Sequence, residues 1–451
     1  MFGYDEFTDR MARAVLSYTH DRLRLDPVPL DRSFRLEELE ARAGNLIGRG
    51  GHDPETVLRI FEDVLAPAVI SIDSPRFLSF IPAAPTKAAL LFDMVVSASS
   101  LSGISWLEAA GAVFAENQAL RFLADLAGLP SGAGGCFVSG GSAANLSALV
   151  VARETARRRR PSVKRWRFAV GDQSHSSITN TARILDVDLL PVASRAGDDR
   201  LTGDALRRAL ADDGDPASIA AVVATAGTTN AGIVDELSSL ADVSAEIDAW
   251  FHIDAAYGGA AMLAPSVRDR FRGIERADSM IVDPHKWFYA PFDCAALLYR
   301  EPALAKRVHA QEASYLDVIH EHEHEWNPTD YAYHLTRRAR GLPLWFSLAV
   351  YGADAYRDAV ETVLATTRLC ADRVRASPHL ELVREPELSI VLFRRIGWTA
   401  ADYDAWSQRL LEQQIAFVTP TRWHGEVVAR FALLHPGTTI DILDEILATT
   451  A

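Results

Sequence analysis

The sequence predicts an α/β protein with a mainly parallel sheet, and three observations support this fold class. Seven short strand-like runs lie between residues 135 and 299, and helical stretches separate them. Strands that alternate with helices are typical of right-handed crossovers in a parallel sheet. With 451 residues and 49% hydrophobic side chains, the chain can form an extensive core and more than one domain.

Residues 1–85 are expected to form an N-terminal helical dimerisation segment. Its helical stretches are interrupted by the prolines within residues 27–30 and by the glycine-rich turn at residues 48–54. The next apolar run, residues 88–97, is shorter than the roughly 20 residues that a membrane-spanning helix needs.

Residues 86–350 are expected to form the large α/β domain, which contains all seven strands. The expected strands are residues 135–138, 168–170, 189–192, 220–224, 250–254, 279–282 and 295–299. Residues 351–451 combine helical stretches with strand-like runs such as 389–393 and 428–434, which predicts a small C-terminal α+β domain.

The composition disfavours several classes of partner. A net charge of −14, from 46 basic and 60 acidic residues, argues against binding to nucleic acid or to anionic membranes. The basic cluster at residues 157–167 is interpreted as a solvated helix end rather than a nucleic-acid site. Cys136, Cys294 and Cys370 are scattered, and no signal peptide is visible. We therefore expect a cytoplasmic protein without a metal site.

The most informative segment is residues 282–292, where Lys286 lies between His285 and Trp287. A lysine in apolar surroundings tends to lose its proton or to be held covalently. A neutral lysine is the nucleophile that forms a Schiff base with an aldehyde. The alternative is a lysine whose stem packs on Trp287 while its ammonium group reaches solvent.

Asp254 supports the covalent interpretation of Lys286. It ends the expected strand 250–254 and is followed by small residues and two glycines. A buried carboxylate needs a cationic partner, and the protonated ring nitrogen of pyridoxal phosphate is such a partner. The alternative is an aspartate that only caps the next helix. Asp254 precedes Lys286 by 32 residues, so a helix and a returning strand could bring both to one edge of the sheet.

Two further segments fit the same cofactor. The run 137–146 predicts a strand, a glycine turn at Gly140 and Gly141, and a helix start that could bind an anion. A glycine turn alone is a weak signal, and its spacing matches neither a Walker loop nor a dinucleotide fingerprint. His175 follows the expected strand 168–170 among small polar residues, although a lone histidine is often structural.

Together these segments resemble the pyridoxal-phosphate-dependent group II amino-acid decarboxylases, most closely the aromatic-L-amino-acid decarboxylase branch. The resemblance runs from residues 5–7 to residues 430–432, and its most specific motif is 283–287. It implies the fold of the type I pyridoxal-phosphate-dependent transferases, with pyridoxal 5'-phosphate as the cofactor. It also implies a homodimer with active sites at the subunit interface.

The resemblance implies a role for each matching residue. Lys286 would be the Schiff-base lysine, Asp254 the partner of the ring nitrogen, and His175 the group stacked on one face of the ring. Ala256 would lie against the other face and Thr229 near the cofactor oxygen. The phosphate would be bound by Gly140, Gly141 and Ser142, with His285 beside them. Asp283 replaces an asparagine of the animal enzymes, and a carboxylate there would repel a phosphate.

The segment after the sheet matches a loop that closes over the active site in this family. Tyr315 corresponds to the tyrosine that protonates the decarboxylated intermediate, which completes the expected catalytic set with Lys286, His175 and Asp254. The histidine- and glutamate-rich run at residues 320–325 departs from the animal pattern. It is interpreted as a hydrated loop, and a metal site is the alternative.

The expected side-chain pocket follows from matching family positions, some of which belong to the partner subunit. These positions are Phe80, Pro82, Ala83, Ile104, Trp106 and Gly341. They are apolar and offer no arginine for a distal carboxylate, although each aromatic could instead serve interface packing. Ala83 replaces a threonine of the animal enzymes, and Gly341 matches a position linked to indole or phenol preference. A side chain such as that of tryptophan or phenylalanine is therefore expected.

The expected activity is decarboxylation of an aromatic or large apolar L-amino acid to its amine and carbon dioxide. Two alternatives use the same scaffold: an oxygen-dependent aromatic aldehyde synthase and a decarboxylase of a non-aromatic amino acid. A third is a binding protein that lacks the cofactor. Retention of Tyr315 and His175 favours the amine over the aldehyde.

Overall fold

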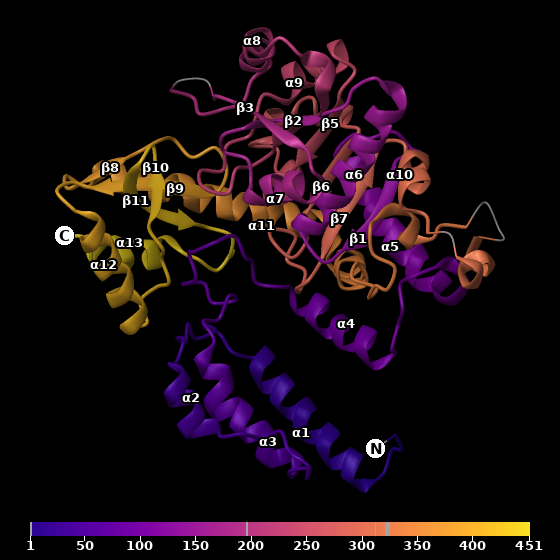
Figure 1. Ribbon diagram of the computed structural model, residues 1–451. Helices are drawn as coiled ribbons and strands as arrows, with labels where there is room; N and C mark the ends of the chain where they lie inside the picture. Colours follow the sequence, from indigo (N-terminus) through magenta and orange to yellow (C-terminus); the bar gives the residue numbers. More distant parts are fainter. Residues whose placement is uncertain (1, 195–196, 312, 321–324) are drawn as a thin grey trace.

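The computed structural model describes residues 2–194, 197–311, 313–320 and 325–451, and the side chains of Tyr315, Asp317 and His320 lie outside this description. Within the described residues, N-terminal helices lead into a layered body around a central sheet, and a smaller sheet follows near the C-terminus (Figure 1). The expected α/β fold class is confirmed.

The N-terminal helices lie outside the layers that surround the central sheet (Figure 1). They are α1 (Glu6–Leu23), α2 (Leu36–Ala43) and α3 (Pro54–Ile60). The carboxylates of Asp5 and Asp53 cap α1 and α3, because each accepts a backbone N–H of the first turn. None of the side chains in these three described helices is buried, so in the single chain their apolar faces remain open.

The central sheet contains seven strands in the described part of the chain, in the order β1-β7-β6-β5-β4-β2-β3. The strands are β1 (Gly134–Val138), β2 (Arg167–Gly171), β3 (Asp188–Val192), β4 (Ile219–Thr225), β5 (Trp250–Asp254), β6 (Ser279–Val282) and β7 (Ala295–Tyr299). β7 is antiparallel to both neighbours, and the other pairs are parallel. Each strand agrees with its expected range to within one residue at either end.

Helices cover both faces of this sheet, so its strands are buried on both sides. One face packs on α6 (Gly141–Arg159), α7 (Ser176–Ile184) and α10 (Pro302–His309), and the other on α5 (Trp106–Leu126), α8 (Gly203–Asp213) and α9 (Leu237–Glu246). Along β2, Phe168 and Val170 pack with the α6 layer, whereas Ala169 packs with the α8 and α9 layer. This alternation follows from the period of two in a strand.

The C-terminal part begins within one long helix. α11 (Leu342–Ala376) crosses the expected boundary at residues 350 and 351, and Gly352 inside it has a non-helical backbone with φ of 75°. A four-stranded antiparallel sheet follows in the order β10-β11-β9-β8. The remaining elements are α4 (Lys87–Ala98), β8 (Leu380–Leu382), β9 (Ile390–Arg395), α12 (Ala400–Glu412), β10 (Thr421–Trp423), β11 (Glu426–Ala432) and α13 (Ile440–Ala448).

Short helical turns connect several of these elements. They are η1 (Phe61–Leu65), η2 (Ala66–Ala68), η3 (Pro216–Ser218), η4 (Gly258–Leu263), η5 (Arg268–Phe271), η6 (Ile274–Arg276), η7 (Ser314–His320) and η8 (Pro328–Tyr331). Over the residues that the structure describes, no helix is both long and apolar enough to span a membrane.

Candidate active site

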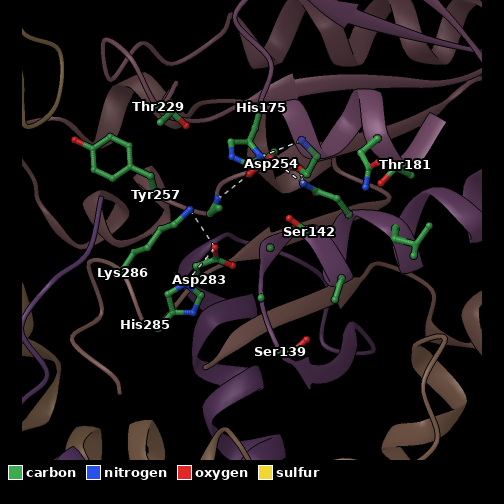
Figure 2. Close-up of a pocket in the computed structure, with 18 of the residues that line it drawn as sticks. Ser139, Ser142, His175, Thr181, Thr229, Asp254, Tyr257, Asp283, His285 and Lys286 are labelled. Carbon is green, nitrogen blue, oxygen red and sulfur yellow. Dashed lines mark hydrogen bonds and ion pairs between the residues drawn. The ribbon is translucent and has the colours of Figure 1, made fainter. Parts of the chain in front are cut away.

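A cavity of about 610 Å³ lies where the parallel strands of the central sheet end. Asp254 ends β5, Thr225 ends β4, and Lys286 follows β6, so separate strands deliver these groups to one edge. Every residue expected to bind the cofactor lines this cavity: Gly140, Gly141, Ser142, His175, Thr229, Asp254, Ala256, His285 and Lys286 (Figure 2).

Lys286 has a carboxylate partner in this cavity. Its Nζ lies 3.1 Å from Oδ2 of Asp283, whose side chain is only 3% exposed. Oδ1 of Asp283 is buried and has no hydrogen-bond partner among the described residues. In Figure 2 a dashed line joins these two side chains. The otherwise apolar surroundings expected for Lys286 therefore include one carboxylate, because the turn after β6 brings Asp283 against the lysine.

Asp254 is buried and tied to the protein through both carboxylate oxygens. Oδ1 accepts the backbone N–H of Ala256 at 3.1 Å, and Oδ2 accepts Nδ2 of Asn145 at 2.9 Å. No Lys, Arg or His forms an ion pair with it in the described part of the chain. A buried carboxylate held in this way has the geometry to receive a cation from a ligand in the cavity.

The glycine turn after β1 forms the N-terminus of the 19-residue helix α6. A Cβ added to Gly141 would lie 2.8 Å from Oδ2 of Asp283, so only glycine allows this close approach. The first turn of a helix presents N–H groups without intrahelical acceptors, and the helix dipole favours an anion there. Gly140, Gly141 and Ser142 are therefore suited to hold a phosphate.

Three further expected residues have defined surroundings. His175 caps α7, and its Nδ1 accepts the backbone N–H of Ser177 at 3.2 Å. The carbonyl oxygen of Thr229 accepts a hydrogen bond of 2.6 Å from Arg430. Burial lowers the pKa of His285, whose Nδ1 lies 2.6 Å from the carbonyl oxygen of Cys294. His285 is thus held by the backbone beside the glycine turn.

The donor set of this cavity fits pyridoxal phosphate. It combines an amine at Lys286, a buried carboxylate at Asp254 that can bind a protonated ring nitrogen, and a helix N-terminus for the phosphate. The carboxylate of Asp283 faces Lys286 and the backbone of Gly141, so it is placed to balance the lysine's charge.

Sequence reasoning missed two residues that line the cavity, Asn145 and Tyr257. Asn145, one turn after Gly141 on α6, hydrogen-bonds Asp254, and the buried Tyr257 stacks on Trp287 with ring centroids 5.4 Å apart. The position of Asn145 could have been predicted from its spacing. A residue four positions after the start of a helix lies on the same face as the turn before that helix. Nothing in the sequence indicates its partner.

The six expected side-chain-pocket residues do not line the cavity of the single chain. Phe80 is 61% exposed, Ala83 is buried, and Pro82, Ile104 and Trp106 are partly buried elsewhere. Gly341 packs directly on β1, because a Cβ there would overlap the ring of Phe137. In this chain the glycine therefore has a packing role, and a role in substrate choice is not apparent from its position.

Two expected features lie partly or wholly outside the described residues. The backbone of Tyr315 belongs to η7, but its side chain is not described. In the histidine- and glutamate-rich run 320–325, residues 321–324 lie outside the described ranges. Across the ranges that are described, no cluster of metal-ligating side chains is present.

His252 on β5 makes folding stability depend on pH. Burial lowers its pKa to about 4 from an unfolded value near 6.5, so the folded chain excludes a proton that the unfolded chain binds. Above pH 6.5 His252 does not lower the free energy of unfolding. As the pH falls from 6.5 toward 4, it lowers this free energy by roughly 3 kcal/mol. In urea unfolding of the cofactor-free protein, His252→Gln should therefore lose less stability between pH 6.5 and pH 4 than the wild-type protein does. Equal losses in both proteins would contradict this.

Comparison with known proteins gives a consistent result. Residues 50–396 match the family model described as the pyridoxal-dependent decarboxylase conserved domain. The aromatic-L-amino-acid decarboxylase of Bacillus atrophaeus is 28% identical over 430 residues, which cover 93% of this chain and 89% of that protein. The L-2,4-diaminobutyrate decarboxylase of Rhizobium meliloti (strain 1021) is 32% identical over 375 residues, covering 80% and 74%.

A solved structure agrees over the full length. The crystal structure of Oryza sativa TDC with PLP and tryptamine superposes with a TM-score of 0.91 and 26% sequence identity. The superposition covers 100% of this chain and 99% of that one. The similarity therefore includes the N-terminal helices and the C-terminal sheet as well as the central body.

Proposed function

Because the chain belongs to the family of pyridoxal-dependent decarboxylases, we propose that it converts an aromatic or large apolar L-amino acid to its amine and carbon dioxide. The cofactor is pyridoxal phosphate. The observation that carries this proposal is the meeting of Lys286, Asp254 and His175 at one cavity. These groups come from three separate segments of the chain.

When bound, the cofactor supplies an electron sink for the negative charge left at the substrate Cα. Lys286 Nζ is the attachment point, and Asp283 Oδ2 holds this amine and its proton at the cavity when Nζ is free. Asp254 would retain the proton of the ring nitrogen, and the N-terminus of α6 would hold the phosphate. His175 would face the bound cofactor and orient the substrate.

Tyr315 completes the reaction in this proposal. The bond between Cα and the carboxylate breaks, its electron pair stays on Cα, and a proton from the Tyr315 hydroxyl takes the place of the carboxylate. Bulk water must be excluded while this happens. We assign this role to the segment that carries η7, because it matches the loop that closes over the active site in this family.

The substrate class is supported by the charges at the cavity. No arginine lines it in the described part of the chain, so a distal carboxylate has no bidentate partner there. Phe292 and Tyr333 line it and offer aromatic surface. The second candidate is a diamino acid, whose second amine would have to compete with Arg340 for Asp293, the carboxylate at the cavity that Arg340 already pairs with. One relative is named for that activity.

A substrate panel tests this choice. Purified enzyme loaded with cofactor is incubated with tryptophan, phenylalanine, tyrosine, dihydroxyphenylalanine, 2,4-diaminobutyrate and glutamate, and the products are identified by mass. We expect tryptamine or phenethylamine as the main amine. A clear preference for dihydroxyphenylalanine would contradict the expected side chain, and diaminopropane as the main product would favour the second candidate.

The amine product depends on Tyr315. In wild type we expect amine and carbon dioxide with little oxygen uptake, because a positioned phenol protonates Cα faster than oxygen reacts there. Tyr315→Phe should shift the products toward aldehyde, ammonia and peroxide, measured with an oxygen electrode and an aldehyde assay. Oxygen uptake equal to substrate consumption in the wild-type enzyme would favour an aldehyde synthase instead.

We also propose a cytoplasmic homodimer whose subunits complete each other's sites. Phe7, Met11, Val15 and Leu16 expose apolar surface along α1, and a second copy could cover it. The side-chain-pocket residues that miss the cavity of the single chain would then belong to the partner's site. Light scattering should give twice the chain mass of 49.4 kDa.

A further inference from the structure

We propose that a buried chain of hydrogen bonds fixes the tautomer of His175, so that its Nε2–H donates into the cavity toward the substrate carboxylate. Asn145 is the positioning residue of this chain of hydrogen bonds, and His252 holds its amide oxygen from the opposite side. The identity of the acceptor rests on the proposed decarboxylation, but the tautomer itself does not.

The first half of the chain connects β5 and β6 to α6. Trp250 Nε1 donates to Ser279 Oγ at 2.8 Å, and Ser279 Oγ lies 2.7 Å from Nδ1 of His252. Nε2 of His252 lies 2.9 Å from Oδ1 of Asn145. These four side chains are all at most 5% exposed, so solvent does not compete for their hydrogen bonds.

The second half connects Asn145 to both proposed cofactor contacts. Asn145 Nδ2 donates to Asp254 Oδ2 at 2.9 Å and to Ser177 Oγ at 3.0 Å. Ser177 Oγ lies 2.9 Å from Nδ1 of His175, and the backbone N–H of Ser177 donates to the same nitrogen at 3.2 Å. One amide therefore links the ring-nitrogen partner to the stacking histidine.

The carboxylate of Asp254 sets the direction of the hydrogen bonds that pass through Asn145. An indole N–H can only donate, so Ser279 accepts from Trp250 and its own hydroxyl proton is free for His252 Nδ1. A carboxylate can only accept, so Asn145 must turn Nδ2 toward Asp254 and Oδ1 toward His252. The Asp254 end therefore requires the proton of the neutral His252 ring on Nε2, and the Trp250 end is compatible with this tautomer.

Burial keeps this link in its neutral form. The pKa of His252 is lowered to about 4, because desolvation outweighs the attraction of the Asp254 charge. At neutral pH the ring therefore has one N–H and one acceptor nitrogen, as the chain requires. A doubly protonated ring would oppose the Ser279 hydroxyl with a second donor.

These hydrogen bonds determine the tautomer of His175. Ser177 Oγ accepts from Asn145, so its hydroxyl proton is directed at His175 Nδ1, which also receives the Ser177 N–H. Nδ1 is thus an acceptor and the ring proton lies on Nε2. Within the described residues Nε2 has no protein partner, and His175 lines the cavity (Figure 2). A fixed donor therefore faces the space where the substrate carboxylate must lie.

The tautomer can be measured without cofactor or turnover. Cofactor-free protein labelled with ¹⁵N-histidine is studied by NMR at pH 8, where an ordinary imidazole is neutral. The His175 resonances are identified by their loss in His175→Gln. We expect a protonated Nε2 and an unprotonated Nδ1. A protonated Nδ1 in the wild-type protein overturns the proposal, even if decarboxylation is confirmed.

Variants test whether the chain of hydrogen bonds sets the His175 tautomer. Asn145→Leu removes the amide that donates to Ser177 Oγ and should give a mixture of His175 tautomers, whereas His252→Gln leaves this amide in place and should keep the single form. Ser177→Ala, a smaller change that removes the hydroxyl itself, serves if Asn145→Leu does not fold. A single Nε2–H form in the folded variants that break the chain would overturn the role of Asn145.

Turnover of the loaded enzyme provides a second readout. We expect kcat of Asn145→Leu to fall by about 10- to 100-fold, and turnover of His252→Gln to stay near wild type. Equal losses in both variants would indicate a merely structural role and contradict the proposal. If wild type instead releases no amine from any amino acid, the proposed function fails, while the NMR result stands on its own.

Discussion

Replacement of Lys286 with alanine is expected to abolish covalent attachment of the cofactor and to lower turnover by at least roughly 10⁴-fold. Lys286 supplies the only amine among the described residues that line the cavity. The protein should still fold. Its free energy of unfolding should drop by roughly 1–3 kcal/mol, because the buried carboxylate of Asp283 loses its cation.

Because the sequence contains few lysines, the residue that binds the cofactor is easy to identify. The chain contains four lysines, namely Lys87, Lys164, Lys286 and Lys306, so borohydride reduction and peptide mass mapping can distinguish every attachment site. Lys306→Ala is the matched control, because Lys306 also lies 3.1 Å from a buried carboxylate, that of Asp330. It should keep the label and the activity. A reduced label on any lysine other than Lys286 would reject the assignment.

Asp254→Asn should slow the chemical step by several powers of ten while covalent attachment persists. The amide carries no charge, so it cannot retain a proton on the ring nitrogen, and the electron sink is weakened. The amide also meets the N–H of Ala256 or the Nδ2 of Asn145 with a donor, which costs some stability. Single-turnover kinetics and the cofactor absorbance separate the two effects.

Asp235 offers a control for the loss of a buried carboxylate. It is 5% exposed, as Asp254 is, and accepts backbone N–H groups of Leu201 and Thr225 at 2.9 and 2.7 Å, but it does not line the cavity. Asp235→Asn should therefore lower stability and leave kcat within about tenfold. Nearly normal turnover in Asp254→Asn, or an equal loss in both variants, would remove Asp254 from its proposed role.

The central sheet was predictable because its strands are short apolar runs between clear helix and turn signals. β5 and β6 coincide with their expected ranges, and the groups that follow them reach the cavity by the ordinary geometry of a parallel sheet. The C-terminal sheet was anticipated only through two of its strands. β8 and β10 have three residues each, which is too few for an alternating hydrophobic pattern to be recognised.

The finer site was less predictable, because it depends on pairs that are distant in sequence. The pattern around Lys286 does not reveal that Asp283 turns inward, and nothing near Asn145 indicates that His252 lies across from it. The expected side-chain pocket shows a different limit. Phe80 and Trp106 match family positions, yet the single chain does not bring them to the cavity, because a match in sequence gives no distance between distant segments.

The antiparallel strand β7 has a consequence for how the protein is made. β1 lies at the edge of the sheet and pairs only with β7 in the described structure, with Gly134 opposite Tyr299. The glycine turn that follows β1 therefore has no partner strand to hold it until a much later part of the chain has left the ribosome. Such long-range pairing is slow to form. We expect nascent chains that end before residue 295 to gain no stability from pyridoxal phosphate, so that cofactor capture marks a late stage of biogenesis.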